Sequence, residues 1–397
     1  DFTSNYKETG SNWYGYYETN THKTIFSGEK TQKISFKEAS QVNGFSDKLE
    51  LQNNDINFAT PIYNVKINQD TQLTNTEKLM ITGTLNTGGY KFATTGNIDA
   101  ERLDMGGAGV EIAGDVAVRT MNVSGSDNLI KGNLMANGGG AAFKQGSLEV
   151  GGNAEFNNGF LQMQDTEDKL LVKGNLTLGE TYGSSKGECL TNGTVEVKGD
   201  FTSNYKETGS NWYGYYETNM HKTIFSGEKT QKISFKEPSQ VNGFNDNLEL
   251  QNNNINFVTP LYSLTVNNDM TISKTEDLQI VTQLIINNGS FVTTGNVEAN
   301  MLNINNTKEN QIQGNLNMTG TVVFKKGSLE VGGNAKFDNG YLQMKDTEDK
   351  LVVKGNMTLG ETYGGSESDC LTNGTVEVKG DFTSNYKETG SNWYGYY

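Results

Sequence analysis

The sequence predicts an all-β fold, a β-solenoid in which coils of 18–25 residues stack in tandem units of about 180–200 residues. Three observations predict it. Long stretches of the chain recur almost unchanged, glycine returns at coil-sized intervals inside each long repeat, and apolar residues alternate with polar ones around these glycines.

The long repeat defines the organisation of the chain. The segment DFTSNYKETGSNWYGYY occurs identically at residues 1–17, 200–216 and 381–397. We therefore expect two complete units, 1–199 and 200–380, and the start of a third unit at 381–397. Because the sequence begins and ends inside this repeat, we expect it to belong to a longer chain or to polymerise end to end.

A shorter repeat lies inside each unit, where a glycine is followed by Asn or Asp and then by an apolar residue. In the first unit these glycines are 18, 18, 20, 22 and 25 residues apart. They are Gly96, Gly114, Gly132, Gly152, Gly174 and Gly199 in the first unit, and Gly295, Gly314, Gly333, Gly355 and Gly380 in the second. One strand, a bend and a second strand in each interval would make one solenoid coil.

The residues around each glycine alternate with the period of a β-strand. Those around Gly174 are Leu170, Val172, Leu176 and Leu178. Period-two alternation predicts strands, and the central glycine indicates a bend or a close approach where a side chain would not fit the narrow interior. Turn formers such as DTEDK and NGG separate the strands, and no helical spacing is sustained.

A β-sandwich is the alternative fold, and the length difference between the units argues against it. The second unit is 18 residues shorter, and the loss falls between Met105 and Ser147, where the first unit carries an additional strand pattern, GVEIAGDVAV. A solenoid closes up after losing one whole coil, whereas a sandwich would lose its strand pairing.

Composition favours a thin, elongated molecule and excludes two classes of partner. Only 34% of the residues are hydrophobic, and the chain has 47 Gly and 3 Pro. The net charge of -15 opposes binding to nucleic acid or to anionic membranes. No run of 18 apolar residues is present, so we expect no membrane span, and residue 1 is not followed by a signal-peptide pattern.

The asparagines that follow the coil glycines are candidates for a ladder of stacked, hydrogen-bonded side chains. These candidates are Asn97, Asn133, Asn153, Asn175, Asn315, Asn334 and Asn356. The alternative is that Asn simply suits the backbone of a bend.

Acidic residues gather in the two copies of a predicted turn, QDTEDKL and KDTEDKL. They are Asp165, Glu167 and Asp168 in the first copy, and Asp346, Glu348 and Asp349 in the second. A solvated turn is the favoured interpretation, ahead of a calcium site and of catalytic carboxylates, because the known calcium-loop spacings are absent. We expect no other metal and no cofactor.

The histidines and cysteines are also copies of single positions. His22 and His221 fall in a predicted core strand, which favours a packed or surface role over a ligand or a base. About nine coils would separate Cys189 from Cys370, on the order of 40 Å, so they cannot bond to each other. Buried thiols are expected, with a lateral bond to a neighbouring chain as the alternative. Hydrolase and nucleotide-binding motifs are absent, so no catalytic residue is expected.

The segment NWYGYY contains all three tryptophans and is the most distinctive loop. Its candidates are Trp13, Tyr14, Tyr16 and Tyr17, then Trp212, Tyr213, Tyr215 and Tyr216, and finally Trp393 and Tyr394. Flat amphipathic rings suit contact with a neighbouring chain or a glycan platform. The alternative is that the loop folds back and covers the flank of the solenoid.

Three motifs, HKTIFSGEKTQKISF, FSDKLELQNNDINFATPIY and LTNGTVEVKGDFT, resemble a module of large, repetitive secreted and cell-surface proteins of Gram-positive, mostly clostridial, bacteria. The resemblance covers both units and implies an extracellular or cell-surface location and a structural role without catalytic residues. In architecture alone, the chain is similar to filamentous-haemagglutinin-like adhesins.

We therefore expect a structural segment of an extracellular bacterial fibre, filament or surface layer that associates with copies of itself, end to end or side by side. The alternative is an adhesin stalk whose aromatic loops bind cell-wall or host glycans. A third possibility, a β-helix polysaccharide-degrading enzyme, would require three or more acidic residues on one face of adjacent coils.

Overall fold

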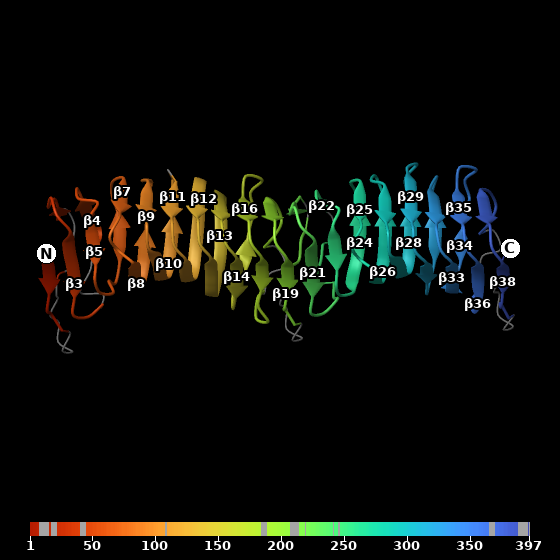
Figure 1. The fold of residues 1–397 in the computed structure, drawn as a ribbon, viewed down its shortest axis with the longest axis horizontal. Helices are drawn as coiled ribbons and strands as arrows, with labels where there is room; N and C mark the ends of the chain where they lie inside the picture. Colours follow the sequence, from red (N-terminus) through yellow and green to blue (C-terminus); the bar gives the residue numbers. More distant parts are fainter. Residues whose placement is uncertain are drawn as a thin grey trace. The chain divides into compact units, whose positions relative to one another are not determined.

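The protein is a β-solenoid, as its sequence predicts. The computed structural model describes residues 1–7, 16, 22–39, 45–107, 109–183, 189–206, 214–218, 220–240, 242–244, 247–364, 370–387 and 396, without the side chains of 46–48. Every regular element in these residues is a β-strand, and strands of successive coils pair in parallel (Figure 1). The chain divides into two compact units, Asp1–Gly199 and Asp200–Tyr397.

Short strands separated by turns make up the described part of the first unit. They are β1 (Phe2–Ser4), β2 (Thr24–Phe26), β3 (Gln32–Phe36), β4 (Phe45–Leu51), β5 (Ile56–Phe58), β6 (Val65–Ile67), β7 (Thr71–Leu73), β8 (Lys78–Asn86), β9 (Phe92–Thr94), β10 (Asn97–Met105), β11 (Val110–Ile112), β12 (Val116–Ile130), β13 (Leu134–Val150), β14 (Ala154–Asn157), β15 (Leu161–Gln162), β16 (Lys169–Val172), β17 (Leu176–Leu178) and β18 (Thr194–Val197).

The second unit repeats this arrangement. Its strands are β19 (Phe201–Ser203), β20 (Lys222–Phe225), β21 (Gln231–Phe235), β22 (Leu248–Leu250), β23 (Ile255–Phe257), β24 (Leu261–Val266), β25 (Met270–Ile272), β26 (Asp277–Ile286), β27 (Phe291–Thr293), β28 (Asn296–Ile304), β29 (Glu309–Ile312), β30 (Leu316–Met318), β31 (Val322–Phe324), β32 (Ser328–Val331), β33 (Ala335–Gly340), β34 (Leu342–Gln343), β35 (Lys350–Val353), β36 (Met357–Tyr363), β37 (Thr375–Val378) and β38 (Phe382–Ser384).

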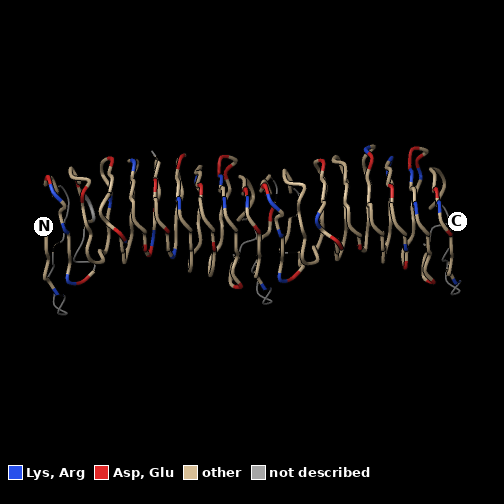
Figure 2. The backbone as a smooth tube through the Cα atoms, viewed as in Figure 1, with Lys and Arg blue, Asp and Glu red and all other residues tan. Residues whose placement is uncertain are grey.

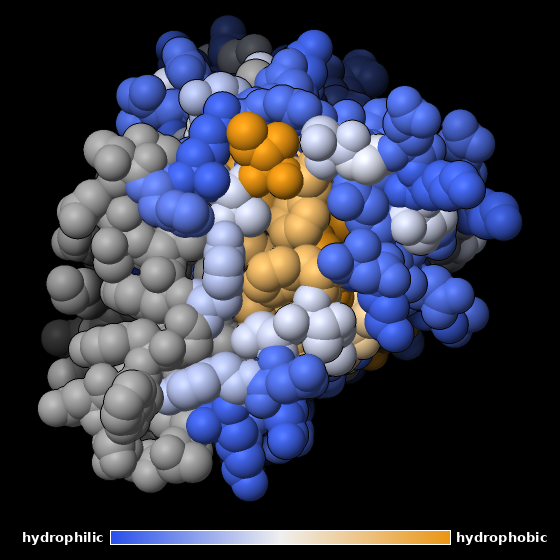
Figure 3. Space-filling model, turned by 90° about the vertical axis from the view of Figure 1, so that its left-hand side faces the viewer, coloured by the Kyte–Doolittle hydropathy of each residue, from blue (hydrophilic) through white to orange (hydrophobic). Residues whose placement is uncertain are grey.

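The core of the first unit is a stack of aligned apolar side chains. Each coil places its inward residue in register with that of the coil before. One such line is Leu79, Ile98, Val116, Leu134, Ala154 and Leu176, and each of these residues is at most 1% exposed. Burying a Leu, Ile or Val side chain contributes about 1.5–3 kcal/mol. Figure 3, viewed from the N-terminal end, shows apolar side chains in the centre and hydrophilic side chains around them.

The second unit has the same line with one coil fewer. Its members are Leu278, Val297, Leu316, Ala335 and Met357. In the first unit, the line of core residues passes through two strands, β12 and β13, between Ile98 and Ala154. In the second unit it passes through only one strand, β30, between Val297 and Ala335. The 18-residue difference in length therefore corresponds to one complete coil.

Aromatic rings fill the core of the first two coils of each unit. In the second unit they are Phe201, Tyr215, Phe225, Phe235 and Phe244, with ring centroids 5.1–5.9 Å apart in largely edge-to-face contacts. Their equivalents in the first unit are Phe2, Tyr16, Phe26, Phe36 and Phe45, at 4.9–6.1 Å. Such pairs add about 0.5–1.5 kcal/mol each beyond burial.

Charged residues recur along the length of each unit (Figure 2). Some pair across adjacent coils: the Lys131 Nζ to Glu111 Oε1 and Lys173 Nζ to Glu149 Oε1 distances are both 2.5 Å. These side chains are exposed, so each pair stabilises the fold by at most about 1 kcal/mol. The strand pairing and the apolar core thus hold the coils together.

Candidate functional site

The asparagines that follow the coil glycines connect one coil to the next. Asn133 Oδ1 accepts a hydrogen bond from the backbone N–H of Asn153 at 2.8 Å, and Asn153 Oδ1 accepts one from that of Asn175 at 2.8 Å. The second unit repeats these 2.8 Å bonds, which run from Asn315 Oδ1 to Asn334 N and from Asn334 Oδ1 to Asn356 N. The bonds join a side-chain oxygen to a backbone amide, and we call this line the Asn ladder.

Aspartate takes the place of asparagine at some positions of the Asn ladder. Asn97 Oδ1 accepts from Asp115 N at 2.7 Å, and Asp115 Oδ1 accepts from Asn133 N at 2.7 Å. In the second unit, Asn356 Oδ1 accepts from Asp381 N at 2.8 Å. Since the bond to the next coil needs only an acceptor oxygen, Asp and Asn are interchangeable in this role. This explains why the motif reads glycine followed by Asn or Asp.

The glycine of the motif makes room for the Asn ladder. A Cβ at Gly174 would lie 2.5 Å from Asn153 Oδ1 and 2.6 Å from the carbonyl oxygen of Gly152. We expected the narrow interior of the coil to exclude a side chain here. The structure corrects this, because the close neighbour is the preceding coil and the glycine is half-buried at the surface.

A second line of polar contacts, which sequence reasoning missed, lies at the end of the long strands. In the second unit, Asn305 Nδ2 donates to Asn287 Oδ1 at 3.0 Å, and Asn287 Nδ2 donates to Asn267 Oδ1 at 3.2 Å. Its signal in the sequence is the recurrence of Asn at positions 267, 287 and 305, intervals of 20 and 18 residues. Stacked amides of this kind keep successive coils in register.

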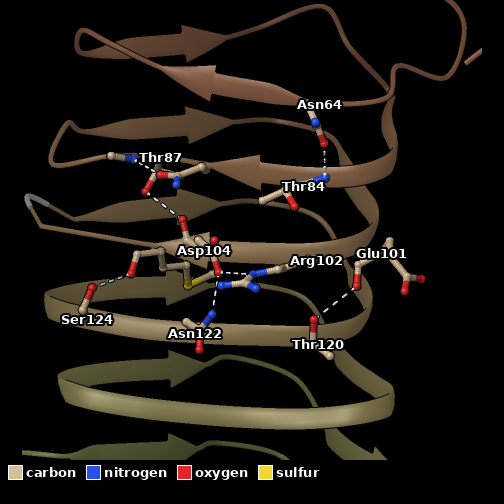
Figure 4. Close-up of polar contacts among 12 residues, drawn as sticks. Asn64, Thr84, Thr87, Glu101, Arg102, Asp104, Thr120, Asn122 and Ser124 are labelled. Carbon is tan, nitrogen blue, oxygen red and sulfur yellow. Dashed lines mark hydrogen bonds and ion pairs between the residues drawn. The ribbon is translucent and has the colours of Figure 1, made fainter. Parts of the chain in front are cut away.

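The long strands of the first unit carry charged side chains near the same end. Asp104 Oδ1 accepts from Asn122 Nδ2 at 2.6 Å and from Arg102 Nε at 2.8 Å (Figure 4). Hydroxyl groups there bond to carbonyl oxygens of neighbouring coils, as Ser124 Oγ does to Met105 O at 3.0 Å. These contacts satisfy polar groups between coils, which is a structural role.

The acidic turns place one carboxylate inside and the others outside. Asp349 is 1% exposed. Its carboxylate accepts from the backbone N–H groups of Lys345 and Asp346, both at 2.9 Å, and of Gly327 at 3.2 Å. Asp168, also 1% exposed, accepts from Gln164 and Asp165 at 3.0 Å and from Gly146 at 3.2 Å. Three converging N–H donors suit an anion that anchors the turn to the preceding coil.

The remaining acidic candidates do not join this carboxylate. Asp165 and Asp346 are half-buried, and Glu167 and Glu348 are exposed. In the described part of the chain, no group of three or more His, Cys, Asp or Glu residues could hold a metal ion. The turn therefore differs from the solvated turn that we favoured, because its last aspartate is a buried structural acceptor.

Two tyrosines of the NWYGYY segment face inward. Tyr215 is fully buried and its hydroxyl lies 2.8 Å from Thr223 Oγ1, while the Tyr16 hydroxyl lies 2.6 Å from Thr24 Oγ1. Both rings belong to the aromatic clusters in the first two coils, and Tyr215, which is fully buried, cannot serve as a platform. Tyr216 is half-buried. The other candidates, Trp13, Tyr14, Tyr17, Trp212, Tyr213, Trp393 and Tyr394, lie outside the described residues.

The two histidines differ although they are copies of one position. His221 is 1% exposed, and its ring lies edge-on to Tyr215, whose hydroxyl neighbour Thr223 donates to Glu217 Oε1. His22 is exposed, and its Nε2 lies 3.3 Å from the Tyr16 hydroxyl. In both units the histidine therefore belongs to the contacts around the inward tyrosine.

The cysteines lie next to the acidic turns. Cys370 is buried and Cys189 is half-buried, and their carbonyl oxygens accept from Met344 N at 2.8 Å and Met163 N at 2.7 Å. A buried tyrosine supports each turn: Tyr182 Oη accepts from Leu161 N at 3.2 Å, and Tyr363 Oη accepts from Leu342 N at 3.1 Å. Burial raises the pKa of both phenols well above the usual value of about 10.

Two shallow grooves mark one face of the first unit. Their volumes are about 610 and 450 Å³, and both are lined by Ala117 and Met135. The first also contacts Glu101 and Arg119, and the second contacts the Asn ladder at Asn133.

Together, the parallel strands, stacked core and Asn ladder define a β-solenoid protein. Comparison with family models, with curated proteins and with solved structures gave no match. Among the described residues, no helix has the length and apolar character needed to cross a membrane.

Proposed function

We propose that the chain is a structural segment of an extracellular bacterial fibre or stalk, in which stacked coils provide length. The observation that carries the proposal is the Asn ladder, whose bonds join coil after coil in the same way in both units. A repeat that is held only by its neighbours can be extended by adding coils, without designing new contacts.

The extracellular and bacterial parts of the proposal rest on the resemblance of three motifs to modules of clostridial-type surface proteins. The net charge of -15 fits a molecule that stays soluble at high local concentration. Self-association, end to end or side by side, is part of the proposal, because the two sheet edges at the ends of a solenoid can add strands.

Electron microscopy of the purified protein, with averaging along any filaments, tests the proposal. We expect filaments with an axial repeat near 4.8 Å and a longer period of about 40–45 Å for the first unit of about nine coils, and about 5 Å less for the second unit, which has one coil fewer. Discrete rods that do not associate would contradict self-association. The proposal would then be reduced to a stalk that acts without forming filaments. Saturable binding of cell-wall glycans, lost in Trp212→Ala, would favour the adhesin instead.

A further inference from the structure

One outward-facing column of side chains differs between the two units. In the first unit, register places Met80, Asp99, Ala117, Met135 and Glu155 on successive strands, and we call this set the Met135 column. The equivalent column of the second unit is Gln279, Glu298, Asn317 and Lys336. Both columns lie beside the Asn ladder of their own unit.

The differences make the first unit more apolar and more acidic at this column. Met80 stands where the second unit has Gln279, and Glu155 stands where it has Lys336, whose ammonium pairs with Asp338 at 2.8 Å. Because the first unit has one more coil, its column contains two residues, Ala117 and Met135, at the place where the column of the second unit contains only Asn317. Met135 is 45% exposed, so its side chain is available to a partner.

The two grooves of the first unit run along either side of the Met135 column. Their lining includes four carboxylates and two cations: Asp99, Glu101, Asp115, Glu155, Lys78 and Arg119. Lys78 Nζ pairs with Asp99 Oδ2 at 2.7 Å, and Arg119 pairs with Glu101. All four of these side chains are about half exposed. Exposed ion pairs contribute at most about 1 kcal/mol, so an incoming cation can replace Lys78 or Arg119 as the partner of its carboxylate.

We propose that this face of the first unit docks an extended peptide that carries lysine or arginine side chains. The methylene stems of such residues pack on apolar surface, here Met80, Ala117 and Met135, while their charged ends reach carboxylates at the rim. The five strands of the Met135 column, about 4.8 Å apart, span roughly 19 Å, which accommodates about six extended residues. The inference does not depend on the fibre proposal.

The test uses a fluorescein-labelled hexapeptide of alternating alanine and lysine, titrated into the whole chain at low salt and followed by fluorescence anisotropy. We expect one peptide for each chain. The variant Met80→Gln, Met135→Asn, Glu155→Lys gives the first unit the second unit's column, and we expect about tenfold weaker binding or more. The reciprocal variant Gln279→Met, Asn317→Met, Lys336→Glu is expected to add a second site.

Two controls separate docking from general attraction to an acidic chain. Glu309→Lys makes the same change of charge as Glu155→Lys at an exposed position of β29, and should leave binding unchanged. Circular dichroism checks that each variant remains folded. Equal binding by the wild type and the first triple variant overturns the proposal, as does an equal loss in Glu309→Lys. Binding of a glucosamine hexamer in place of the peptide also overturns it.

Discussion

Asn153 shows that one side-chain atom determines which substitutions the coil tolerates at this position. Its Oδ1 accepts the backbone N–H of Asn175, while its own N–H donates to Asn133 Oδ1. The side-chain contact to the following coil thus requires an acceptor and nothing more, which Asp115 already shows at another step of the Asn ladder.

We expect Asn153→Asp to be nearly neutral and Asn153→Ala to lower the free energy of unfolding by about 0.5–1.5 kcal/mol, because the amide of Asn175 then loses its acceptor. Urea unfolding followed by circular dichroism measures both. If the aspartate variant is as unstable as the alanine variant, the Nδ2 group of Asn153 contributes and the acceptor-only account is wrong.

At this scale the sequence shows which residues matter but not how they bond. The spacing of glycine and asparagine identifies the Asn ladder positions, yet the amide partner belongs to the next coil and only the register reveals it. The buried position of Asp349 was also unpredictable, since the sequence offers no difference between Asp346, Glu348 and Asp349 that assigns one of them to the interior.

At the scale of the element, a backbone N–H of the preceding coil holds the acidic turn, and a tyrosine of the following coil holds the short strand before it. Tyr363 reaches Leu342 N from the end of β36, and Tyr182 does the same for Leu161 in the first unit. Burial keeps both phenols neutral, and this links the stability of the turns to pH.

We expect the free energy of unfolding to fall as the pH rises above about 10, the ordinary tyrosine value. Below that pH both states are protonated and the full stability is present. Above it the unfolded phenols ionise, whereas the folded ones resist because burial raises their pKa. The double variant Tyr182→Phe, Tyr363→Phe should lose about 1 kcal/mol for each hydrogen bond at neutral pH but decline less steeply in alkali.

Urea titrations at several pH values between 8 and about 11.5 measure this slope. Tyr90→Phe, which changes an exposed ring, is the matched control. Identical alkaline slopes in the wild type and the double variant would contradict the link between these two phenols and stability.

Strands were the most predictable elements, because alternation around the glycines fixes which residues face inward. The alternation expected around Gly174 corresponds to β16 and β17, whose residues Leu170, Val172, Leu176 and Leu178 are all fully buried. The inward turn of Tyr215 was not predictable, because tyrosine in a polar loop suits the surface and the interior equally.

At the scale of the whole molecule, the two units show that one complete coil can be inserted or removed while the pattern of the other coils is kept. The residues Asp115–Gly132 form one period, and removing them joins Gly114 directly to Asn133, which restores the motif. Ile98 would then lie beside Leu134 in the core, in the same way that Val297 lies beside Leu316.

We expect the chain lacking 115–132 to fold with strand content and an unfolding midpoint close to those of the wild type, because a solenoid closes over a missing layer. Deletion of 115–123 is the control, since half a coil turns every following side chain to the wrong face. Circular dichroism and thermal unfolding compare the two. Equal damage by both deletions would show that the coil is not an independent layer.

The Asn ladder also gives each unit a polarity. Every one of its bonds has the acceptor oxygen on the earlier coil and the donor amide on the later coil. During translation the earlier coil leaves the ribosome first, so each acceptor is in place before its donor arrives. The solenoid can therefore fold vectorially from its N-terminal side, with each completed coil serving as the template for the next.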